Sequence, residues 1–400
     1  MDLTDHRWRR ADELFDKALD LPSAQRSSYL DDACGNDQEL RKLVEKLLAD
    51  AETSVSQLTP GGGLEGPLWD GLAFELGSGS HGLVGETVGP YEVVREIGRG
   101  GMAEVFLAQA KDGRKPDWVA LKVLRLGADT DELLQRFERE RQILDRAQHP
   151  HIAQLLEGGV CGDGRPFLAM EFVEGKSIDR FSDDQALDLS ARLRLFLQVA
   201  QAVEYAHRSH VIHRDIKPSN ILVTAAGRVK LLDFGIARLL EGADVSHAAI
   251  PLTQSHSRLM TPAYASPELI RSARVTIASD IYQLGLLLFL LLTGRWPYPV
   301  FKRHPGDVVQ MVCRQEAIPP SEAVVDPDAP RPPEGGTETP DDLAATRRSS
   351  VGKLHLALSG QLDGIVLKAL RKEPSQRYST IGQWIDEISA YLENARAVET

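Results

Sequence analysis

The chain has 400 residues and is 42% hydrophobic, which allows two or three domains and a sizeable buried core. Its formal net charge of -12 argues against nucleic acid or an anionic membrane surface as the main partner. The three cysteines, at positions 34, 161 and 313, lack CxxC spacing, which argues against a zinc site or a disulfide framework and fits a reducing compartment.

Neither an export signal nor a membrane span is visible in the sequence. The N-terminus, MDLTDHRWRRADELF, carries charges where a signal peptide would need an apolar stretch. The longest apolar run, residues 284–292, is well short of the ~20 residues that a span requires, and it predicts a buried helix. We therefore expect a folded, cytoplasmic protein.

Residues 1–50 form the first predicted unit, and residues 51–88 form a linker. Apolar residues at steps of three and four, such as Trp8, Ala11 and Phe15, predict helices in the first unit. The linker is rich in Gly, Ser and Pro and is expected to be flexible. The helical unit could either stabilise the rest of the chain or take part in docking or regulation.

A glycine-rich turn between two strands follows the linker. The sequence IGRGGMAEVFLAQA at residues 97–110 predicts a strand, a turn and a second strand. Glycines such as Gly98 and Gly100 let backbone N–H groups face a phosphate, because no Cβ stands in the way. A hairpin turn that binds no ligand would explain the same glycines.

The next two elements each place one charged residue among apolar ones. Lys122 lies in the predicted strand Trp118–Leu124, where it either needs a charged partner or faces the surface. In the predicted helix 131–148, Glu140 lies on the inward stripe that includes Phe137. An inward carboxylate requires a cation.

The chain is predicted to leave a strand at residues 170–173 and to be mainly helical from there on. We therefore predict a small β-rich lobe at residues 89–173 and a larger helical lobe at residues 174–395. Within the helical lobe, residues 317–350 are rich in Pro, Gly, Thr and acidic residues and predict a disordered insertion. Its RRSS sequence at residues 347–350 could be phosphorylated or could belong to a solvated loop.

The most informative stretch is VIHRDIKPSNIL at residues 211–222. It supplies a proton acceptor, a cation and an oxygen ligand in Asp215, Lys217 and Asn220, and Asp233 adds a second carboxylate in LLDFG. Phosphoryl transfer requires a base, a fixed cation and Mg²⁺ ligands, and these side chains provide all three. Each alone could be a cap or turn residue, so the prediction depends on the combination.

The motifs HRDIKPSN and DFG occur together with IGRGGMAEVF, WVALKVL, TPAYASPE and RKEPSQRY, in the order found in protein kinases. From about residue 89 to residue 392, the chain resembles a bacterial serine/threonine protein kinase of the eukaryotic-like (Hanks) type. The resemblance implies an α+β, bilobal protein-kinase fold with a β-rich N-lobe and a larger helical C-lobe, here preceded by a small helical segment.

The resemblance also implies a role for each motif residue. Asp215 orients the substrate hydroxyl and accepts its proton, and Lys217 holds the γ-phosphate. Asn220 and Asp233 hold Mg²⁺. In the same way, Lys122 contacts the α- and β-phosphates of ATP and pairs with Glu140, which agrees with the inward position of that carboxylate.

A nucleotide site at the junction of the two lobes is implied as well. Ala103 stands where the family's glycine-rich loop has its third glycine, which puts only the geometry of the loop tip in doubt. Met170 is the implied gatekeeper, Glu171 and Val173 bind adenine through their backbones, and Leu222 forms the floor. The complete implied set is Ile97, Gly98, Gly100, Val105, Ala120, Lys122, Met170, Glu171, Val173 and Leu222.

Scaffold roles follow from the same resemblance. His213 is expected to pack against Phe234 rather than to act as a base. Glu268 is expected to pair with Arg377, and Asp280 is expected to hold the backbone of the catalytic loop.

Residues 235–260 have a loop-like composition and, by the resemblance, correspond to the activation loop of the family. Thr253, Ser255 and Ser257 are candidate sites of self-phosphorylation, with Arg214 as the cation that would bind the phosphate; exposed hydroxyls without a role are the alternative. The following TPAYASPE, at residues 261–268, has Ser266 where the family has alanine. Thr261 and the spacing of Lys217 are typical of serine/threonine kinases.

The predicted function is transfer of the ATP γ-phosphate to Ser or Thr hydroxyls of proteins, with Mg²⁺. Transient self-association for autophosphorylation is possible, and nucleic acid is not an expected partner. A catalytically dead pseudokinase scaffold is the alternative, although such proteins usually lack equivalents of Lys122, Asp215 or Asp233 and this chain keeps all three. A small-molecule kinase is disfavoured by TPAYASPE, which belongs to peptide recognition in the family.

Overall fold

The computed structural model of the protein describes residues 83–99, 103–111, 113, 115–124, 149–232, 262–271, 273–300, 305–332 and 338–399, together with a few residues between 14 and 41. The chain forms two compact units, Met1–Gly66 and Pro67–Thr400. In the first unit, the described residues 29–30 and 33–34 are helical, and both Leu30 and Cys34 are buried.

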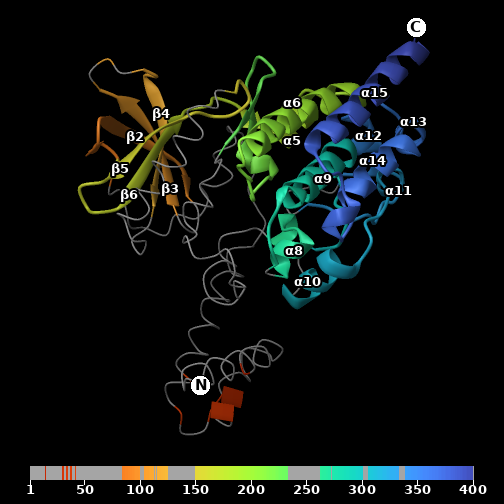
Figure 1. Ribbon diagram of the computed structural model, residues 1–400, viewed down its shortest axis with the longest axis horizontal. Coiled ribbons are helices and arrows are strands. Elements are labelled where there is room, and N and C mark those ends of the chain that lie inside the picture. The colour runs from red at the N-terminus through yellow and green to blue at the C-terminus, as the bar shows by residue number, and fades with distance from the viewer. Residues whose placement is uncertain are drawn as a thin grey trace. The chain divides into compact units, whose positions relative to one another are not determined.

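The second unit begins with a six-stranded antiparallel sheet, which forms the N-lobe (Figure 1). The strand order is β1-β2-β3-β4-β6-β5. The strands are β1 (Thr87–Val88), β2 (Tyr91–Arg99), β3 (Ala103–Ala110), β4 (Trp118–Leu124), β5 (Leu155–Val160) and β6 (Pro166–Glu171).

The sheet includes the end of the segment predicted to be a linker. Val88 of β1 and Leu83 just before it are both buried in the core of the sheet, and β1 pairs with β2. The prediction of a flexible linker through residue 88 is therefore wrong for residues 83–88. The apolar side chains of Leu83 and Val88 pack on the sheet, and this burial favours an ordered structure. The average composition of residues 51–88 does not reveal these two positions.

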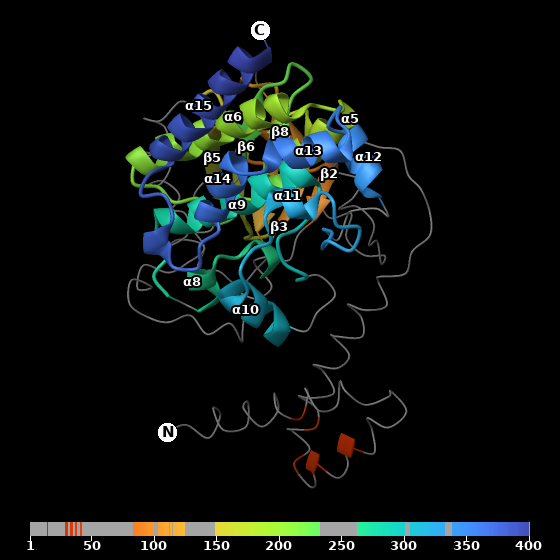
Figure 2. The same ribbon diagram turned by 90° about the vertical axis from the view of Figure 1, so that its right-hand side faces the viewer.

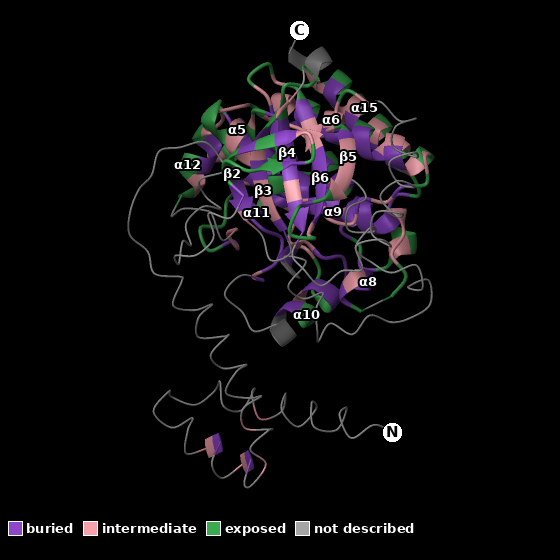
Figure 3. Ribbon diagram, turned by 90° about the vertical axis from the view of Figure 1, so that its left-hand side faces the viewer, coloured by how far each residue is buried: buried purple, intermediate pink, exposed green. Residues whose placement is uncertain are grey.

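Side chains alternate between the two faces of the sheet, as the two-residue period of a strand requires. One face carries a core that includes Phe106, Leu121 and Phe167, and the other carries a smaller cluster that includes Leu124 and Leu168. Buried residues run along β4 and β6 (Figure 3). Lys122 therefore shares the face of Leu124 and Leu168.

The C-lobe contains a small sheet and most of the helices in the described part of the chain (Figures 1 and 2). The sheet has the order β7-β8-β9, with β7 (Lys176–Ser177), β8 (Ile221–Val223) and β9 (Val229–Leu231). The α-helices are α5 (Ile178–Asp184), α6 (Leu189–Arg208), α8 (Pro267–Ile270), α9 (Ile277–Thr293), α10 (Pro305–Arg314), α11 (Pro320–Ala323), α12 (Pro340–Ala345), α13 (Val351–Leu358), α14 (Gln361–Ala369) and α15 (Ile381–Glu399). Short 3-10 helices are η2 (Pro218–Asn220), η3 (Pro262–Tyr264) and η4 (Pro374–Gln376).

Helix α9 is the centre of the C-lobe. Residues 278–293 are buried without exception, which confirms the buried helix predicted from the apolar run at residues 284–292. The helix begins at a capping box of Thr276 and Ser279 and ends at Gly294, whose φ of 67° lies in the left-handed region. It packs against α6 and α14, and α15 packs against α6 (Figure 2). Among the described helices, none combines the length and the apolar character needed to cross a membrane.

The predicted disordered insertion is wrong for the described parts of residues 317–350. Helices α11 and α12 form there, and Val324, Leu343 and Ala344 are buried. Thr339 starts α12 with a capping box that also uses Asp342. Residues 333–337 lie outside the described part of the chain.

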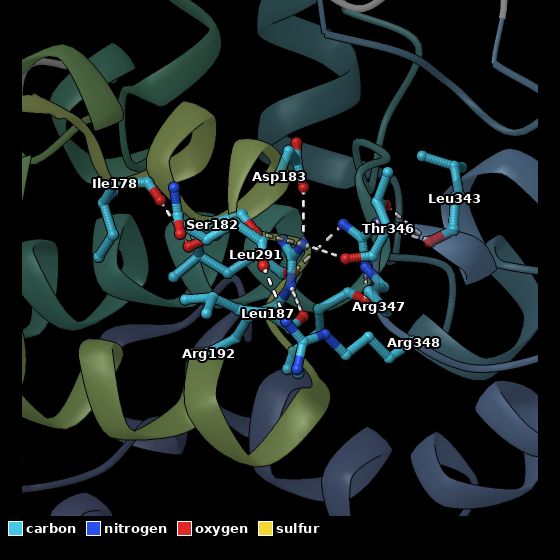
Figure 4. Close-up of polar contacts among 12 residues, drawn as sticks. Ile178, Ser182, Asp183, Leu187, Arg192, Leu291, Leu343, Thr346, Arg347 and Arg348 are labelled. Carbon is cyan, nitrogen blue, oxygen red and sulfur yellow. Dashed lines mark hydrogen bonds and ion pairs between the residues drawn. The ribbon is translucent and has the colours of Figure 1, made fainter. Parts of the chain in front are cut away.

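A buried arginine anchors this segment to the C-terminal end of α9 (Figure 4). Arg347 donates to the carbonyl oxygens of Leu292 at 2.6 Å and Leu291 at 3.2 Å, while Arg192 of α6 donates to Leu291 at 3.2 Å and to the carbonyl of Thr346 at 2.9 Å. These carbonyls lie at or near helix ends, where a cation interacts favourably with the helix dipole.

The RRSS sequence is therefore not simply a solvated loop, because its first arginine is buried. Burial and the nearby charge of Arg192 lower the pKa of Arg347. The polar composition of the segment suggested disorder, but one of its cations satisfies carbonyl groups inside the lobe.

Candidate active site

The catalytic loop has no regular secondary structure from Val211 to Lys217 and then forms η2 before it enters β8. Arg214 has a φ of 70°, which is strained for a residue with a side chain. Asp280 of α9 accepts the backbone N–H groups of His213 and Arg214, each at 2.8 Å. The predicted role of Asp280 is confirmed, and its two hydrogen bonds hold the strained backbone in place.

Two further residues, which none of the sequence motifs indicated, support the loop. Gln283 accepts the backbone N–H of Ile216 at 3.1 Å and donates to the carbonyl of Arg214 at 3.0 Å. His207 of α6 hydrogen-bonds Oδ2 of Asp280 through Nε2 at 2.7 Å. Gln283 stands one turn after Asp280, so the helical period could have indicated it.

The structure brings three of the predicted site residues together. Nζ of Lys217 lies 2.9 Å from Oδ2 of Asp215, and Nδ2 of Asn220 donates to the same oxygen at 2.9 Å. Asn220 also donates to the backbone carbonyl of Asp215 at 2.8 Å. Among the described residues, the side-chain contacts of Asp215 with Lys217 and Asn220 are made by Oδ2.

His213 is buried, and the geometry assigns it a structural position. Its Nδ1 lies 3.3 Å from the backbone N–H of Asp215, which can only donate, so Nδ1 is the acceptor. The proton then lies on Nε2, which donates to the carbonyl of Leu232 at 3.0 Å. With both nitrogens engaged, His213 is not placed to act as the base; its predicted contact with Phe234 lies outside the described residues.

The residues expected to hold Mg²⁺ fit that ion as far as they are described. Because Nδ2 of Asn220 makes two hydrogen bonds, its Oδ1 is left as a ligand, and oxygen is the donor that Mg²⁺ prefers. The second predicted ligand, Asp233, lies outside the described residues. No group of three or more His, Cys, Asp or Glu side chains suited to a metal occurs in the described part of the chain.

Strand register aligns the predicted nucleotide-site residues of the N-lobe. Gly98 pairs with Val105, Val105 with Lys122, and Ala120 with Met170. Directly opposite residues project to the same face of a sheet, so Val105, Ala120, Lys122 and Met170 share one face. Of the other predicted residues, Ile97, Val173 and Leu222 are buried, whereas Gly100 and Glu140 lie outside the described residues.

The predicted ion pair between Glu268 and Arg377 is confirmed. Both guanidinium NH groups of Arg377 donate to Glu268, each at 2.8 Å, and both side chains are buried. Ser279 of α9 donates to the same carboxylate at 2.6 Å. The pair therefore joins α8, α9 and the segment before α15. The candidate phosphorylation sites at positions 253, 255 and 257, and Thr261, lie outside the described residues.

Ser266, where the family has alanine, is fully buried and its hydroxyl has no hydrogen-bond partner among the described residues. A buried hydroxyl without a partner is destabilising. We therefore expect Ser266→Ala to raise the free energy of unfolding by about 1 kcal/mol. Urea unfolding followed by tryptophan fluorescence measures this change, and a loss of stability on substitution would contradict the expectation.

Comparison with known proteins identifies the family of this chain. The family described as "Protein kinase domain" matches residues 91–389, and the chain belongs to this family. Its curated relatives include bacterial serine/threonine-protein kinases, which confirms the resemblance, and the family match together with a solved kinase domain confirms the bilobal α+β fold.

PrkC of Bacillus subtilis is 32% identical over 302 residues, covering 74% of this chain and 40% of PrkC. PknB of Mycobacterium tuberculosis is 33% identical over 298 residues, covering 73% of this chain and 41% of PknB. The chain thus spans about two fifths of the length of these curated relatives. The crystal structure of the Mycobacterium tuberculosis PknI kinase domain aligns with a TM-score of 0.50 and 29% identity, covering 77% of this chain and 98% of that domain.

Proposed function

We propose that this chain transfers the γ-phosphate of ATP to Ser and Thr hydroxyls of proteins. The observation that carries the proposal is the cluster of Asp215, Lys217 and Asn220, in which a carboxylate, an ammonium group and an amide lie within hydrogen-bond distance. Membership in the protein kinase family and the similarity to bacterial serine/threonine kinases support it.

Each of the three side chains has its own role in the proposed reaction. Oδ1 of Asp215 accepts the proton of the substrate hydroxyl, while Oδ2 is held by Lys217 and Asn220. The ammonium group of Lys217 stabilises charge on the transferred phosphoryl group. When bound, Mg²⁺ neutralises phosphate oxygens; Oδ1 of Asn220 and the carboxylate of Asp233 would hold it.

The proposal also includes regulation and a cellular compartment. Self-phosphorylation at Thr253, Ser255 or Ser257 would place a dianionic group where Arg214 can bind it, after transient association of two copies. None of the three cysteines forms a disulfide bond with another described residue and all are buried, which fits a reducing compartment such as the cytoplasm. A pseudokinase scaffold is disfavoured because the sequence keeps Lys122.

Purified full chain, incubated with labelled ATP, Mg²⁺ and a mixture of Ser-, Thr- and Tyr-containing peptides, tests the proposal. We expect label on phosphoserine and phosphothreonine, loss of transfer when the metal is chelated, and strong loss in Lys122→Met. Label on tyrosine alone, or equal transfer by wild type and the variant, would overturn it.

A further inference from the structure

The side chain of Glu171 makes contacts that its predicted backbone role does not require. Glu171 is the last residue of β6, where the chain leaves the N-lobe sheet. Nζ of Lys230 in β9 lies 2.8 Å from Oε1 and 2.9 Å from Oε2, and the backbone N–H of Gln154 donates to Oε2 at 3.1 Å. The backbone N–H of Glu171 in turn donates to the carbonyl of Gln154 at 2.8 Å. Both backbone and side chain of Glu171 are therefore held.

Lys230 lies opposite a predicted nucleotide-site residue in the small sheet. It pairs directly with Leu222 of β8, the residue predicted to form the floor of the adenine site. Directly opposite residues project to the same face, so the side chains of Lys230 and Leu222 lie next to each other. The ion pair consequently connects the end of β6 with the strand pair that carries the predicted floor.

The backbone joint between the lobes does not depend on this ion pair. Ile152 forms a parallel bridge with Leu231, whose N–H donates to the carbonyl of His151 at 2.8 Å and whose carbonyl accepts from Ala153 at 2.9 Å. Lys230 adds a longer contact of 3.4 Å to the carbonyl of Ile152. Removal of the Lys230 charge would therefore leave the main-chain connection intact and free mainly the side chain of Glu171.

The partial exposure of the two side chains also indicates that the ion pair is not needed to hold the lobes together. Lys230 is 20% exposed and Glu171 is 30% exposed, and ion pairs with this access to water contribute little to global stability. The Glu171 carboxylate nevertheless has two different partners, because Lys230 contacts both oxygens and the backbone N–H of Gln154 donates to Oε2, and together they restrict its orientation. The contribution of the pair lies in geometry more than in stability.

We propose that the ion pair between Glu171 and Lys230 positions the nucleotide site by fixing the end of β6 relative to Leu222. Adenine bound to the backbone of Glu171 and in contact with Leu222 would then meet two residues that are already held in place, so less conformational freedom would be lost on binding. The inference rests on the proposed function. Glu171 and Lys230 act here as positioning residues, because neither side chain touches the reacting atoms.

Loss of the pair should weaken ground-state and transition-state binding of ATP equally, so KM for ATP rises while kcat stays nearly constant. We expect Lys230→Met and Glu171→Gln each to raise KM for ATP about fivefold, the lower end of coupling between linked sites. KM for a peptide substrate should stay unchanged. The charge-reversed double variant, Glu171→Lys with Lys230→Glu, should recover part of the loss.

Steady-state kinetics on the full chain, with direct binding of a fluorescent ATP analogue, measure these effects. Lys368→Met is the control, since it removes a lysine, here half-exposed, that is also paired with a carboxylate, Glu387, on the helical side of the C-lobe. If wild type binds the analogue and the Lys230 and Glu171 variants bind it equally well, the positioning role is wrong. If wild type binds no nucleotide and transfers no phosphate, the proposed function itself fails.

Discussion

Asp215→Asn is expected to lower the rate of phosphoryl transfer roughly 10²- to 10⁴-fold, the contribution of a general base. The amide has the size of the carboxylate and can still accept hydrogen bonds from Lys217 and Asn220, whose nitrogens lie 2.9 Å from Oδ2 in the wild type. It cannot accept the proton of the substrate hydroxyl. Initial rates of transfer to a serine peptide, at saturating ATP, measure the effect.

The melting temperature of the Asp215 variant serves as its control and should change little, because the loop is held by Asp280 and Gln283 rather than by the Asp215 side chain. Unchanged transfer by a well-folded Asp215→Asn protein would mean that another group accepts the proton or that a contaminating kinase supplies the activity. Either result would remove Asp215 from the role assigned to it.

Breaking the buried pair of Glu268 and Arg377 is expected to destabilise the protein by about 3 to 5 kcal/mol. Glu268→Gln would leave the guanidinium group of Arg377 in the interior without its counter-charge. Arg377 also donates to the carbonyls of Ala278 and Arg371, each at 2.7 Å, so it cannot easily turn toward solvent. Urea unfolding followed by tryptophan fluorescence gives the free-energy change.

A matched control for the buried pair is Lys176→Met, which breaks a half-exposed pair with Asp184. Its effect should be about 0 to 1 kcal/mol, because water screens exposed charges. Equal effects of Glu268→Gln and Lys176→Met would show that burial of the Glu268 pair adds nothing to its contribution.

The same buried pair gives a pH dependence of stability. Burial alone would raise the pKa of Glu268, but the hydrogen bonds and charge of Arg377, helped by Ser279, outweigh it and hold the pKa below its ordinary value. The contribution of Glu268 is therefore fully present above the unfolded pKa of about 4.3 and is lost as pH falls toward the lower folded pKa. The free energy of unfolding of wild type should fall more steeply with acidification in this range than that of Glu268→Gln, and parallel pH profiles would contradict this assignment.

The residues that carry the chemistry could be predicted because they stand close together in the chain. Asp215, Lys217 and Asn220 fall within six residues, and a loop of that length held at both ends must bring their side chains near one another. The buried helix α9 was equally predictable, since a long run of apolar residues has no stable position in water. The partners Asp280 and Arg377 followed from the family resemblance, and the structure confirms their contacts.

The contacts that could not be predicted join residues far apart in the chain whose side chains carry no local pattern. Lys230 and Glu171 are 59 positions apart, and Arg347 and Leu292 are 55 positions apart. Neither contact therefore produces the short helical or strand period that can be recognised in a sequence. For residues 317–350, composition indicated disorder because charged and proline residues usually remain in water. In the folded protein the described parts of the segment are ordered instead. The last carbonyl groups of α9 have no partner within the helix, and they form an interior site where hydrogen bonds stabilise the Arg347 cation.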